Sequence, residues 1–582
     1  MPGPGPHNRE EPSEPHVSDR LDSWKEIAAY LKRDERTVRR WEEREGLPVH
    51  RHQHKSRAAI FAYKSELGAW WDNGRKRLEG QEPAAAARRR AWFLWPAAAT
   101  ATILVFVGGM YARNWLRGRS ALAHVESIAV LPLANLSQDA AQDYLADGLT
   151  EDLTTDLGKL SVFRVISRTS TIQYKGTKKS IPEIARELHV DAVVEGAVLR
   201  SGDKVRITAQ LIDAAADRHV WAETYDRDLR DVLALQADVA HAIAVQIRGK
   251  LSSSPPPHGA SPLNPEAYEL YLKGRYSRDE GTEDGLKLAF EYFRQALERD
   301  SQYAPAYAGL ADSYAHLPFY SETRPEEAFP KAKAAATKAL QLDQTLAEAH
   351  ASMAYVKTYY DWDWAGAEAE FKRGLELNPN YADVHHSYSR FLASLGRVAE
   401  ARAELKRAQE LDPLSLLVQV NAGVISYFGR EYDQAIQELQ KIKEVNPKFP
   451  VPYWGIGLCY EQKGMYQEAV DQLQKGIAVS GGRGANSIAS LAHAYGLAGQ
   501  HGEAQKILAE LEKRSKKTYV SSYQIALVYL GQRQNDKAME QLENAYQEHS
   551  TLLTYLKMDP RFDPLRSDPR FQDLVHRIGL PQ

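Results

Sequence analysis

Cysteine is nearly absent from the sequence, which has one such residue, Cys459, in 582. A single thiol cannot form an intramolecular disulfide, and it excludes zinc sites that need two or four cysteines. Catalytic fingerprints are missing as well, since the chain contains no phosphate-binding loop, kinase signature, nucleophile elbow, metalloprotease helix or dinucleotide-binding motif. We therefore expect a protein that is not an enzyme and that has neither a metal nor a cofactor.

Long apolar runs are scarce too, and the sequence has one, residues 91–112. These 22 residues include no charged side chain, and as a helix they would extend about 33 Å, enough for a bilayer core of about 30 Å. Cations are more frequent before the run than after it, with Arg75, Lys76, Arg77, Arg88, Arg89 and Arg90 against Arg113, Arg117 and Arg119. The length of the run predicts one transmembrane helix, and the bias in cations predicts that its amino terminus is cytoplasmic. A buried helix of a soluble domain is the alternative.

Charge is unevenly distributed, although the net charge of the whole chain is only −3. Residues 20–90 contain 18 Lys and Arg against 11 Asp and Glu, so this part is basic. Before it, residues 1–19 are rich in Pro, Gly and Glu and lack the apolar region of a signal peptide, which predicts a disordered tail. The chain as a whole has ordinary globular composition and, with 582 residues, is long enough for about three or four domains.

Two short amphipathic helices are predicted within the basic part. In the first, Ser23 is the N-cap of a helix whose apolar side chains share one face: Trp24, Ile27, Ala28 and Leu31. The second covers residues 35–45 and ends at Gly46, with Val38 and Trp41 inward and the arginines outward. Two such helices joined by a tight turn form a helix-turn-helix, whose basic second helix fits the major groove of DNA.

The phrase WKEIAAYLKRDERTVRRWEEREGLPVHR resembles MerR-like and excisionase-like winged helix-turn-helix modules. The resemblance implies that residues 20–74 bind double-stranded DNA and that residues 48–57 form the wing. The predicted DNA-contacting residues are Arg36, Thr37, Arg39, Arg40, Arg51, Lys55 and Arg57. A solvated charged helix in a protein-interaction module is the alternative.

Alternating histidines at 50, 52 and 54 raise the question of a metal site in the predicted wing. Supporting carboxylates or cysteines are not found nearby in the sequence, and the neighbouring Arg51, Lys55 and Arg57 would repel a cation. A wing that faces phosphate groups is therefore favoured over a metal site.

Strand and helix patterns alternate over residues 125–251, which predicts an α/β domain. The predicted elements are strands at 127–131 and 163–166, helices at 143–160 and 181–188, a hairpin of 192–199 and 205–212, a strand at 219–225 and a closing helix at 229–251. The runs SIAVLPLANLSQDAAQDYLADGLTEDLTTDL and DAVVEGAVLRSGDKVRITAQLIDA resemble FlgO-like or TolB-amino-terminal-like domains. That resemblance implies no catalysis.

Acidic residues recur along the first helix of this domain, at Asp139, Asp143, Asp147, Glu151, Asp152 and Asp156. They could form a cation site or act as general acids and bases. Acidic groups that cap and solvate one helix are the favoured interpretation.

A 34-residue period marks the rest of the chain after a Pro/Ser linker at 252–263, which we expect to space two domains apart. Alanines that open the second helix of each unit recur at steps of 34 or 35, as Ala367, Ala401, Ala435, Ala469, Ala504 and Ala538. This is tetratricopeptide-repeat (TPR) spacing, and it predicts about eight helix pairs over 264–550 with a groove for proteins or peptides. Residues 551–582 are expected to cap the last helix.

The predicted fold class is therefore multidomain and mainly α: a winged helix-turn-helix, a basic linker at 75–90, one transmembrane helix, a linker at 113–124, a small α/β domain and a TPR α-solenoid. This order resembles ToxR-type membrane-bound transcription regulators of bacteria. It implies a one-component regulator in the inner membrane, with a cytoplasmic DNA-binding head and a periplasmic sensor from residue 113 onward. The alternative is a membrane-anchored TPR scaffold for envelope assembly that binds no specific DNA sequence. Whether the chain forms a homodimer is left open.

Overall fold

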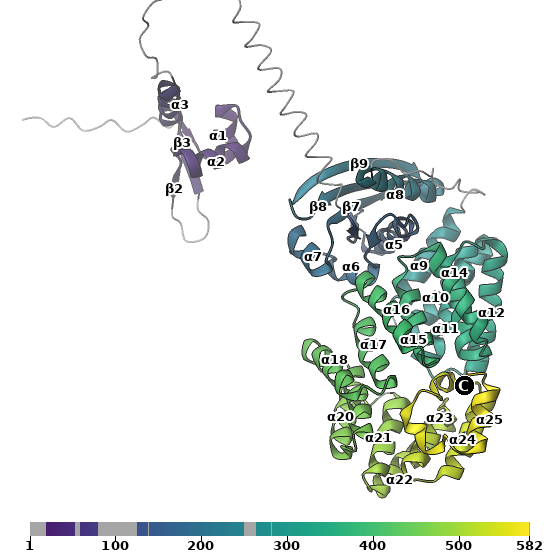
Figure 1. The fold of residues 1–582 in the computed structure, drawn as a ribbon. Helices are drawn as coiled ribbons and strands as arrows, with labels where there is room; N and C mark the ends of the chain where they lie inside the picture. The colour runs from purple at the N-terminus through teal and green to yellow at the C-terminus, as the bar shows by residue number, and fades with distance from the viewer. Residues whose placement is uncertain are drawn as a thin grey trace, which may run out of the picture. The chain divides into compact units, whose positions relative to one another are not determined.

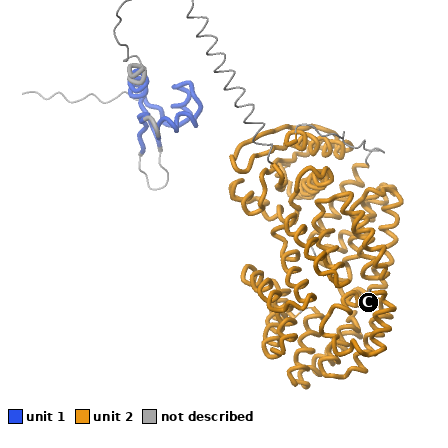
Figure 2. Tube along the Cα trace, viewed as in Figure 1, with its two compact units in different colours: residues 1–107 blue, residues 108–582 orange. Residues whose placement is uncertain are grey.

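The computed structural model describes residues 19–52, 59–78, 125–137, 139–248, 264–280, 282–482 and 484–580. Contacts divide the chain into two compact units, residues 1–107 and 108–582 (Figure 2). The tail, the predicted transmembrane segment 91–112 and the predicted linkers 113–124 and 252–263 lie outside the described residues. Within the described residues, no helix combines the length and the hydropathy that a membrane span requires.

The described residues of the first unit form three helices and a small antiparallel sheet. The helices are α1 (Trp24–Leu31), α2 (Glu35–Glu45) and α3 (Lys64–Leu78), and the strands are β1 (Arg20–Leu21), β2 (His50–His52) and β3 (Ala59–Tyr63). The strand order is β1-β3-β2, so that β3 pairs on both sides. Its core contains Leu21, Ile27, Ala28, Val38, Leu47, Ala62 and Leu67.

Capping residues set the ends of the two predicted helices. The Ser23 side chain accepts a hydrogen bond from the Glu26 backbone N–H at 3.2 Å, which confirms its role as N-cap of α1. Gly46 ends α2 with a φ of 68°, a left-handed conformation that glycine adopts without a steric penalty. Helix α3 was not predicted, and it continues past residue 74, the expected end of this domain.

The second unit begins with a mixed sheet in the order β6-β4-β7-β8-β9, with β5 also paired to β7. The strands are β4 (Ser127–Val130), β5 (Ala134–Asn135), β6 (Arg164–Val165), β7 (Ala192–Ser201), β8 (Lys204–Asp213) and β9 (Arg218–Asp228). Strand β4 is parallel to β6 and β7, whereas β7, β8 and β9 are antiparallel. The predicted hairpin is confirmed, and its connection is the two-residue turn Gly202-Asp203 between β7 and β8.

Helices cover both faces of this sheet, as the alternation along β4 requires. Ile128 and Val130 pack with α5 (Asp143–Lys159) and α8 (Val232–Arg248). Ala129 and Leu131 face the other way, toward α7 (Ile181–Leu188). The remaining short elements are η2 (Ala140–Gln142), α6 (Arg168–Thr171), η3 (Ile172–Tyr174) and η4 (Leu229–Asp231).

Eight helix pairs follow within the described residues. They are α9 (Pro265–Arg278) and α10 (Glu283–Arg299), α11 (Ala304–Tyr320) and α12 (Pro325–Leu342), α13 (Ala347–Val356) and α14 (Trp364–Leu377), α15 (Ala382–Ser394) and α16 (Val398–Leu411), α17 (Leu416–Phe428) and α18 (Tyr432–Val445), α19 (Val451–Gln462) and α20 (Tyr466–Val479), α21 (Ala485–Leu497) and α22 (His501–Ser515), α23 (Ser522–Gly531) and α24 (Asn535–Gln547). A π-helical turn, η5 (Lys357–Asp361), extends α13. All six periodic alanines are fully buried, because a methyl group is what the close contact between paired helices accommodates.

The C-terminal segment consists of η6 (Thr551–Tyr555), η7 (Pro560–Leu565) and α25 (Pro569–Arg577). Phe562 and Leu574 are buried against α23 and α24, so the segment covers the last pair (Figure 1). It also reaches helices far back in the sequence: the Trp364 ring N–H donates to the Ile578 carbonyl at 2.9 Å, and the Tyr359 and Tyr555 hydroxyls are 3.1 Å apart. The segment therefore joins the last repeats to α13, α14 and η5.

The α/β domain and the repeats share one hydrophobic core, which corrects the expectation that the linker spaces them apart. Ala267, Tyr268 and Leu272 of α9 are buried in the same cluster as Leu145 and Leu149 of α5. Gly148 permits this approach, because a Cβ at that position would lie 2.6 Å from the Leu272 side chain. The apolar face of α9 is thereby buried against α5. Fully burying a leucine side chain such as that of Leu272 stabilises the folded state by about 1.5–3 kcal/mol.

Candidate functional site

Helix α2 presents its cations to solvent while its apolar residues anchor it. Val38 is fully buried, and the Trp41 ring lies 5.8 Å from the rings of Trp70 and Trp71 on α3. Arg36, Arg39 and Arg40 are exposed on the opposite side. The orientation predicted for α2 is thus confirmed, and α3 supplies the aromatic surface that fixes it.

The predicted DNA-contacting residues differ in whether their charged groups already pair with other groups of the protein. Arg39 lies over the Trp24 ring, 5.0 Å from its centroid, and 3.9 Å from Glu35. Arg51 pairs with Glu42 at 2.5 Å. Arg36 and Arg40 have no ion-pair partner among the described residues, so they are the two guanidinium groups of this set that are available to an external anion.

Thr37 has a structural role at the start of α2. Its backbone N–H donates to Asp34 Oδ1 at 2.9 Å, and its hydroxyl donates to Asp34 Oδ2 at 2.8 Å. These two hydrogen bonds lower the pKa of the exposed Asp34 carboxyl and make it the N-cap. Lys55 and Arg57 lie outside the described residues.

The described part of the predicted wing contains β2, which pairs antiparallel with β3 just beyond the predicted wing, so that His50 lies opposite Phe61. Residues 53–57 of the predicted wing lie outside the described residues. His50 Nε2 lies 2.6 Å from Glu66 Oε2, and its ring stacks on Phe61 with 5.3 Å between centroids. Among the described residues, no group of three His, Cys, Asp or Glu could hold a metal ion. His50 therefore connects the wing to α3, while His54 lies outside the described part of the chain.

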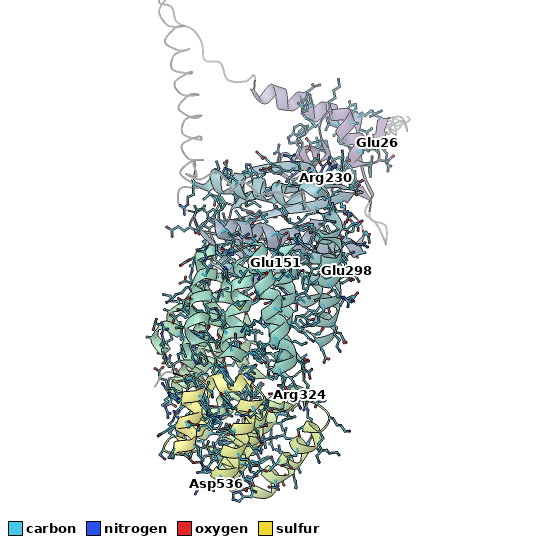
Figure 3. The ribbon with its side chains drawn as sticks, turned by 90° about the vertical axis from the view of Figure 1, so that its right-hand side faces the viewer. Glu26, Glu151, Arg230, Glu298, Arg324 and Asp536 are labelled. Atoms are coloured by element: carbon cyan, nitrogen blue, oxygen red, sulfur yellow. The ribbon has the colours of Figure 1, made fainter. Side chains whose placement is uncertain are left out.

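The acidic series on α5 forms the contact between the α/β domain and the repeats (Figure 3 labels Glu151 at this junction). Arg275 of α9 forms ion pairs with both Glu151 and Asp152. Asp152 Oδ2 also accepts hydrogen bonds from the Tyr268 hydroxyl at 2.8 Å and from Gln236 at 3.0 Å. Although burial opposes the shift, the Arg275 charge holds the pKa of Glu151 below its ordinary value.

Asp147 is the most deeply buried of these carboxylates, at 4% exposure. It lies 3.0 Å from Lys175 and 3.9 Å from Arg168, and Arg168 in turn pairs with Asp279 at the end of α9, at 2.5 Å. The interpretation of the series as solvated acids is therefore wrong for its central members. Asp139 caps the short helix η2, where it accepts from the Ala141 backbone N–H at 2.9 Å, whereas α5 itself begins after Gln142 without a side-chain cap.

Loops between repeats hold the edge of the sheet. Asn380 donates to the carbonyls of Gly158 at 3.0 Å and Phe163 at 3.2 Å, and its side-chain oxygen accepts from the Val165 N–H at 3.2 Å. Farther along, the Ser170 hydroxyl donates to Asp412 at 2.5 Å. These contacts join residues more than 200 positions apart, so local sequence patterns could not have indicated them.

Comparison with known proteins now gives the central domain a family. Residues 124–242 match the family described as HilA/YgeH-like transcriptional regulator, second domain, and residues 363–419 and 452–481 match tetratricopeptide repeats. The chain contains a HilA/YgeH-like regulator domain and TPR repeats. The family matched by residues 124–242 thus differs from the FlgO-like or TolB-amino-terminal-like family that the sequence of this domain resembles.

Two curated relatives illustrate the extent of the match. The chain is 41% identical to "Putative adenylate cyclase 3" of Rhizobium meliloti (strain 1021) over 187 residues, which are 32% of each protein. It is 24% identical to "Transcriptional regulator HilA" of Salmonella typhimurium over 168 residues, 29% of this chain and 30% of that one. The matches thus span about a third of the length of these relatives.

Solved structures of helical-repeat proteins are also similar to parts of the chain. PilW, a type IV pilus biogenesis factor, matches with a TM-score of 0.32 and 19% identity over 39% of this chain and 98% of that one. Yeast Tom70 matches with a TM-score of 0.36 and 15% identity over 75% of this chain and 88% of that one.

Proposed function

We propose that this protein is a one-component transcription regulator whose amino-terminal head binds double-stranded DNA and whose second unit receives the signal. The observation that supports this most directly is the order of its parts: a helix-turn-helix with a wing precedes a domain of the HilA/YgeH-like transcriptional regulator family. The relative HilA is itself named a transcriptional regulator.

In this proposal α2 enters the major groove, and Arg36 and Arg40, which have no ion-pair partner among the described residues, reach base edges or phosphates. Arg39 stays stacked on Trp24, and Thr37 keeps the helix start in place through Asp34. The wing lies beside the neighbouring phosphates, where Lys55 and Arg57 add charge. The head has its own core, so it can present α2 independently of the second unit.

The second unit would act as one body rather than as two domains on a flexible tether. Its HilA/YgeH-like domain and its first repeats have a common hydrophobic core and are joined by the ion pairs of Arg275 with Glu151 and Asp152. A partner protein that binds the repeats would therefore act on the whole unit. Anchoring by residues 91–112 in a bacterial inner membrane, with the second unit in the periplasm, belongs to the same proposal. It rests on the apolar run and on the cations before it.

A selection for genomic fragments that bind residues 1–90 tests the proposal. We expect enrichment of a defined duplex, and the same fragment should shift that duplex in electrophoresis at salt concentrations where unrelated duplexes stay free. Lys55→Ala and Arg57→Ala should each weaken binding to all DNA sequences alike. Each should also reduce the slope of the logarithm of the binding constant against the logarithm of the salt concentration by about one.

Trp41→Ala is the control for folding of the head, because its ring fixes α2 against α3. Absence of any preferred duplex for the unmutated head, together with binding to anionic vesicles that follows total charge, would favour the scaffold alternative and remove the regulator proposal.

A further inference from the structure

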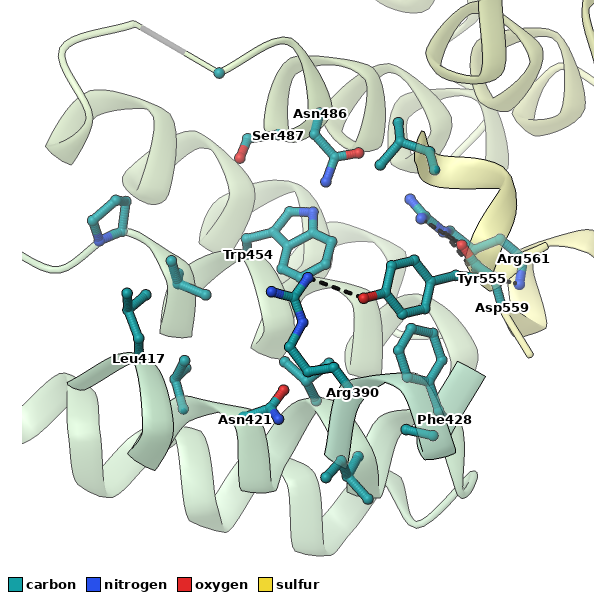
Figure 4. A pocket seen from close by; sticks show the side chains of 18 of the residues that line it. Arg390, Leu417, Asn421, Phe428, Trp454, Asn486, Ser487, Tyr555, Asp559 and Arg561 are labelled. Atoms are coloured by element: carbon teal, nitrogen blue, oxygen red, sulfur yellow. Dashed lines mark hydrogen bonds and ion pairs between the residues drawn. The ribbon is translucent and has the colours of Figure 1, made fainter. Parts of the chain in front are cut away.

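The second half of the repeat array encloses a cavity of about 530 Å³ (Figure 4). Its walls come mainly from α15, α17, α19 and α21, the first helices of four successive pairs, and from residues 552–561 of the C-terminal segment. Pockets of about 300–1,000 Å³ are typical of sites for small organic ligands. Because the C-terminal segment covers one side, the cavity suits a compact ligand rather than a long extended chain.

Apolar side chains form most of the wall. They include Leu417, Val420, Val424, Phe428, Val451 and Leu552, with the Trp454 ring among them. Trp454 is held in place by a hydrogen bond from its ring N–H to Ser490 at 3.1 Å, and Phe428 stacks on Tyr555 with 5.3 Å between centroids. The cavity therefore offers a preformed apolar surface.

A guanidinium group without a carboxylate partner points into this apolar cavity. Figure 4 shows Arg390 of α15 extending between Trp454 and Tyr555. Its Nη2 donates to the Tyr555 hydroxyl at 2.9 Å, and within the described residues no carboxylate pairs with it. A desolvated cation that lacks an anion is costly, which is why such groups are normally paired.

The other ionisable groups of the cavity leave this charge uncompensated. Asp559 is the single acidic residue among the described lining residues, and it pairs with Arg561 at 2.6 Å. His386, one turn before Arg390, stays neutral because burial and the Arg390 charge lower its pKa to about 3. The cavity thus carries one net positive charge, located at Arg390.

A second polar group lies on the opposite wall. Asn486 of α21 has a buried side-chain oxygen that accepts no hydrogen bond from the described residues. Figure 4 shows its amide near the cavity, across from Arg390. Buried amides are normally satisfied, so this oxygen lacks a hydrogen-bond donor, which an N–H group of the peptide form of a ligand could supply.

We infer that this cavity binds a compact ligand made of a carboxylate attached to an apolar group. Arg390 donates hydrogen bonds to the carboxylate, in the bidentate geometry that guanidinium and carboxylate share. Because the unsatisfied oxygen of Asn486 is an acceptor, it does not bind the carboxylate, which Arg390 alone contacts. Trp454, Phe428 and Leu417 pack around the apolar part. The site goes beyond the proposed function and stands without it, since it requires nothing of the DNA-binding head. The carboxylate belongs either to a free small acid or to the C-terminal end of a protein chain.

Calorimetric titration of residues 120–582 tests the inference, because this piece contains all described residues of the second unit with their own cores. One arm uses octanoate and 4-phenylbutyrate, and the other a short peptide ending in Leu-Phe with a free carboxyl terminus. Each is paired with its neutral amide. We expect the acid form in at least one arm to bind about 10- to 100-fold more tightly than its amide, as a charge-assisted hydrogen bond implies. The arm that binds identifies the source of the carboxylate.

Substitutions at one position then locate the contact. Arg390→Gln should abolish the preference for the acid over the amide, whereas Arg390→Lys should retain part of it. Arg373→Gln is the matched control, because Arg373 is a half-exposed arginine on α14 that pairs only locally, with Glu376. Circular dichroism spectra check that each variant is folded.

Three results would overturn the inference. These are equal binding of acid and amide by the unmutated protein, no binding of any acid at millimolar concentration, and an acid preference that survives Arg390→Gln. The comparison of acid with amide on the unmutated protein needs no variant, so it holds even if Arg390→Gln fails to fold. Failure of the DNA-binding proposal would leave all of these measurements unchanged.

Discussion

Arg275 and Arg390 occupy comparable places in the repeat array, on the first helices α9 and α15, but their surroundings differ. Arg275 is 7% exposed and pairs with two carboxylates of the HilA/YgeH-like domain, Glu151 and Asp152. Arg390 faces an apolar cavity and donates to the hydroxyl of Tyr555. In the first repeats α5 of the same chain covers the arginine, whereas farther along the arginine lines a cavity that the C-terminal segment covers on one side.

This difference separates structural from functional charges. Where the chain supplies the anion, the arginine stabilises the contact between two domains, and its removal leaves buried carboxylates. Where the chain supplies none, the cost of the half-buried cation at Arg390 is offset when a ligand brings the anion. The same distinction applies to the head, where Arg51 is paired with Glu42 but Arg40 has no ion-pair partner among the described residues.

The largest effect is expected from Arg275→Met. It leaves Glu151 and Asp152 without their cation in a partly buried site, and breaking such a pair costs about 3–5 kcal/mol. Urea unfolding of residues 120–582, followed by circular dichroism, measures the loss. Arg294→Met should change the unfolding free energy by no more than about 0.5 kcal/mol, because Arg294 is exposed and pairs only with Glu291 on its own helix.

Neutralising Asp152, a partner of Arg275, tests whether unpaired carboxylates cause the loss of stability in Arg275→Met. The double variant Arg275→Met with Asp152→Asn should be more stable than Arg275→Met alone, since one uncompensated charge is removed. Equal stability of the two variants would show that Arg275 acts through packing and not through its charge.

Acid should weaken the same contact. Glu151 has a folded-state pKa below its ordinary value of 4.5, so its ionised form stabilises the folded unit above pH 4.5. That stabilisation is lost as the pH falls from 4.5 through the lower folded-state pKa. Unfolding free energies measured between pH 5 and pH 3 should therefore decrease less steeply in Glu151→Gln than in the unmutated protein. Parallel curves for the two proteins would contradict this account.

In the head, Arg40→Ala should weaken binding of the selected duplex by about 1–3 kcal/mol if the contact is to a base edge. Its thermal stability should stay unchanged, because Arg40 has no ion-pair partner among the described residues. Arg51→Ala should have a smaller effect on binding, since Glu42 already neutralises part of its charge. Electrophoretic shifts on the isolated head measure both, and a larger loss for Arg51→Ala would reverse this order.

Sequence periodicity predicted most local elements but few of the contacts between them. The alanine spacing fixed the register of six repeats because each repeat packs mainly on its neighbours, and the alternation of strand and helix patterns predicted the α/β domain. The Asp152–Arg275 pair spans 123 positions, and Tyr359 and Tyr555 are 196 apart. Such partners leave no local pattern, so the shared core, the reach of the C-terminal segment and the cavity could not be predicted.

The smallest effect, and the sharpest contrast with Arg275, is expected from Arg390→Met in the absence of ligand. Methionine has a similar length and no charge, so it removes the desolvation cost of a cation that has no carboxylate partner within the described residues. Tyr555 still has the Tyr359 hydroxyl as a partner, at 3.1 Å. The unfolding free energy should therefore stay within about 1 kcal/mol of the unmutated value or increase. A loss of 3 kcal/mol or more, as expected for Arg275→Met, would mean that Arg390 stabilises the array and that its charge is not kept for a ligand.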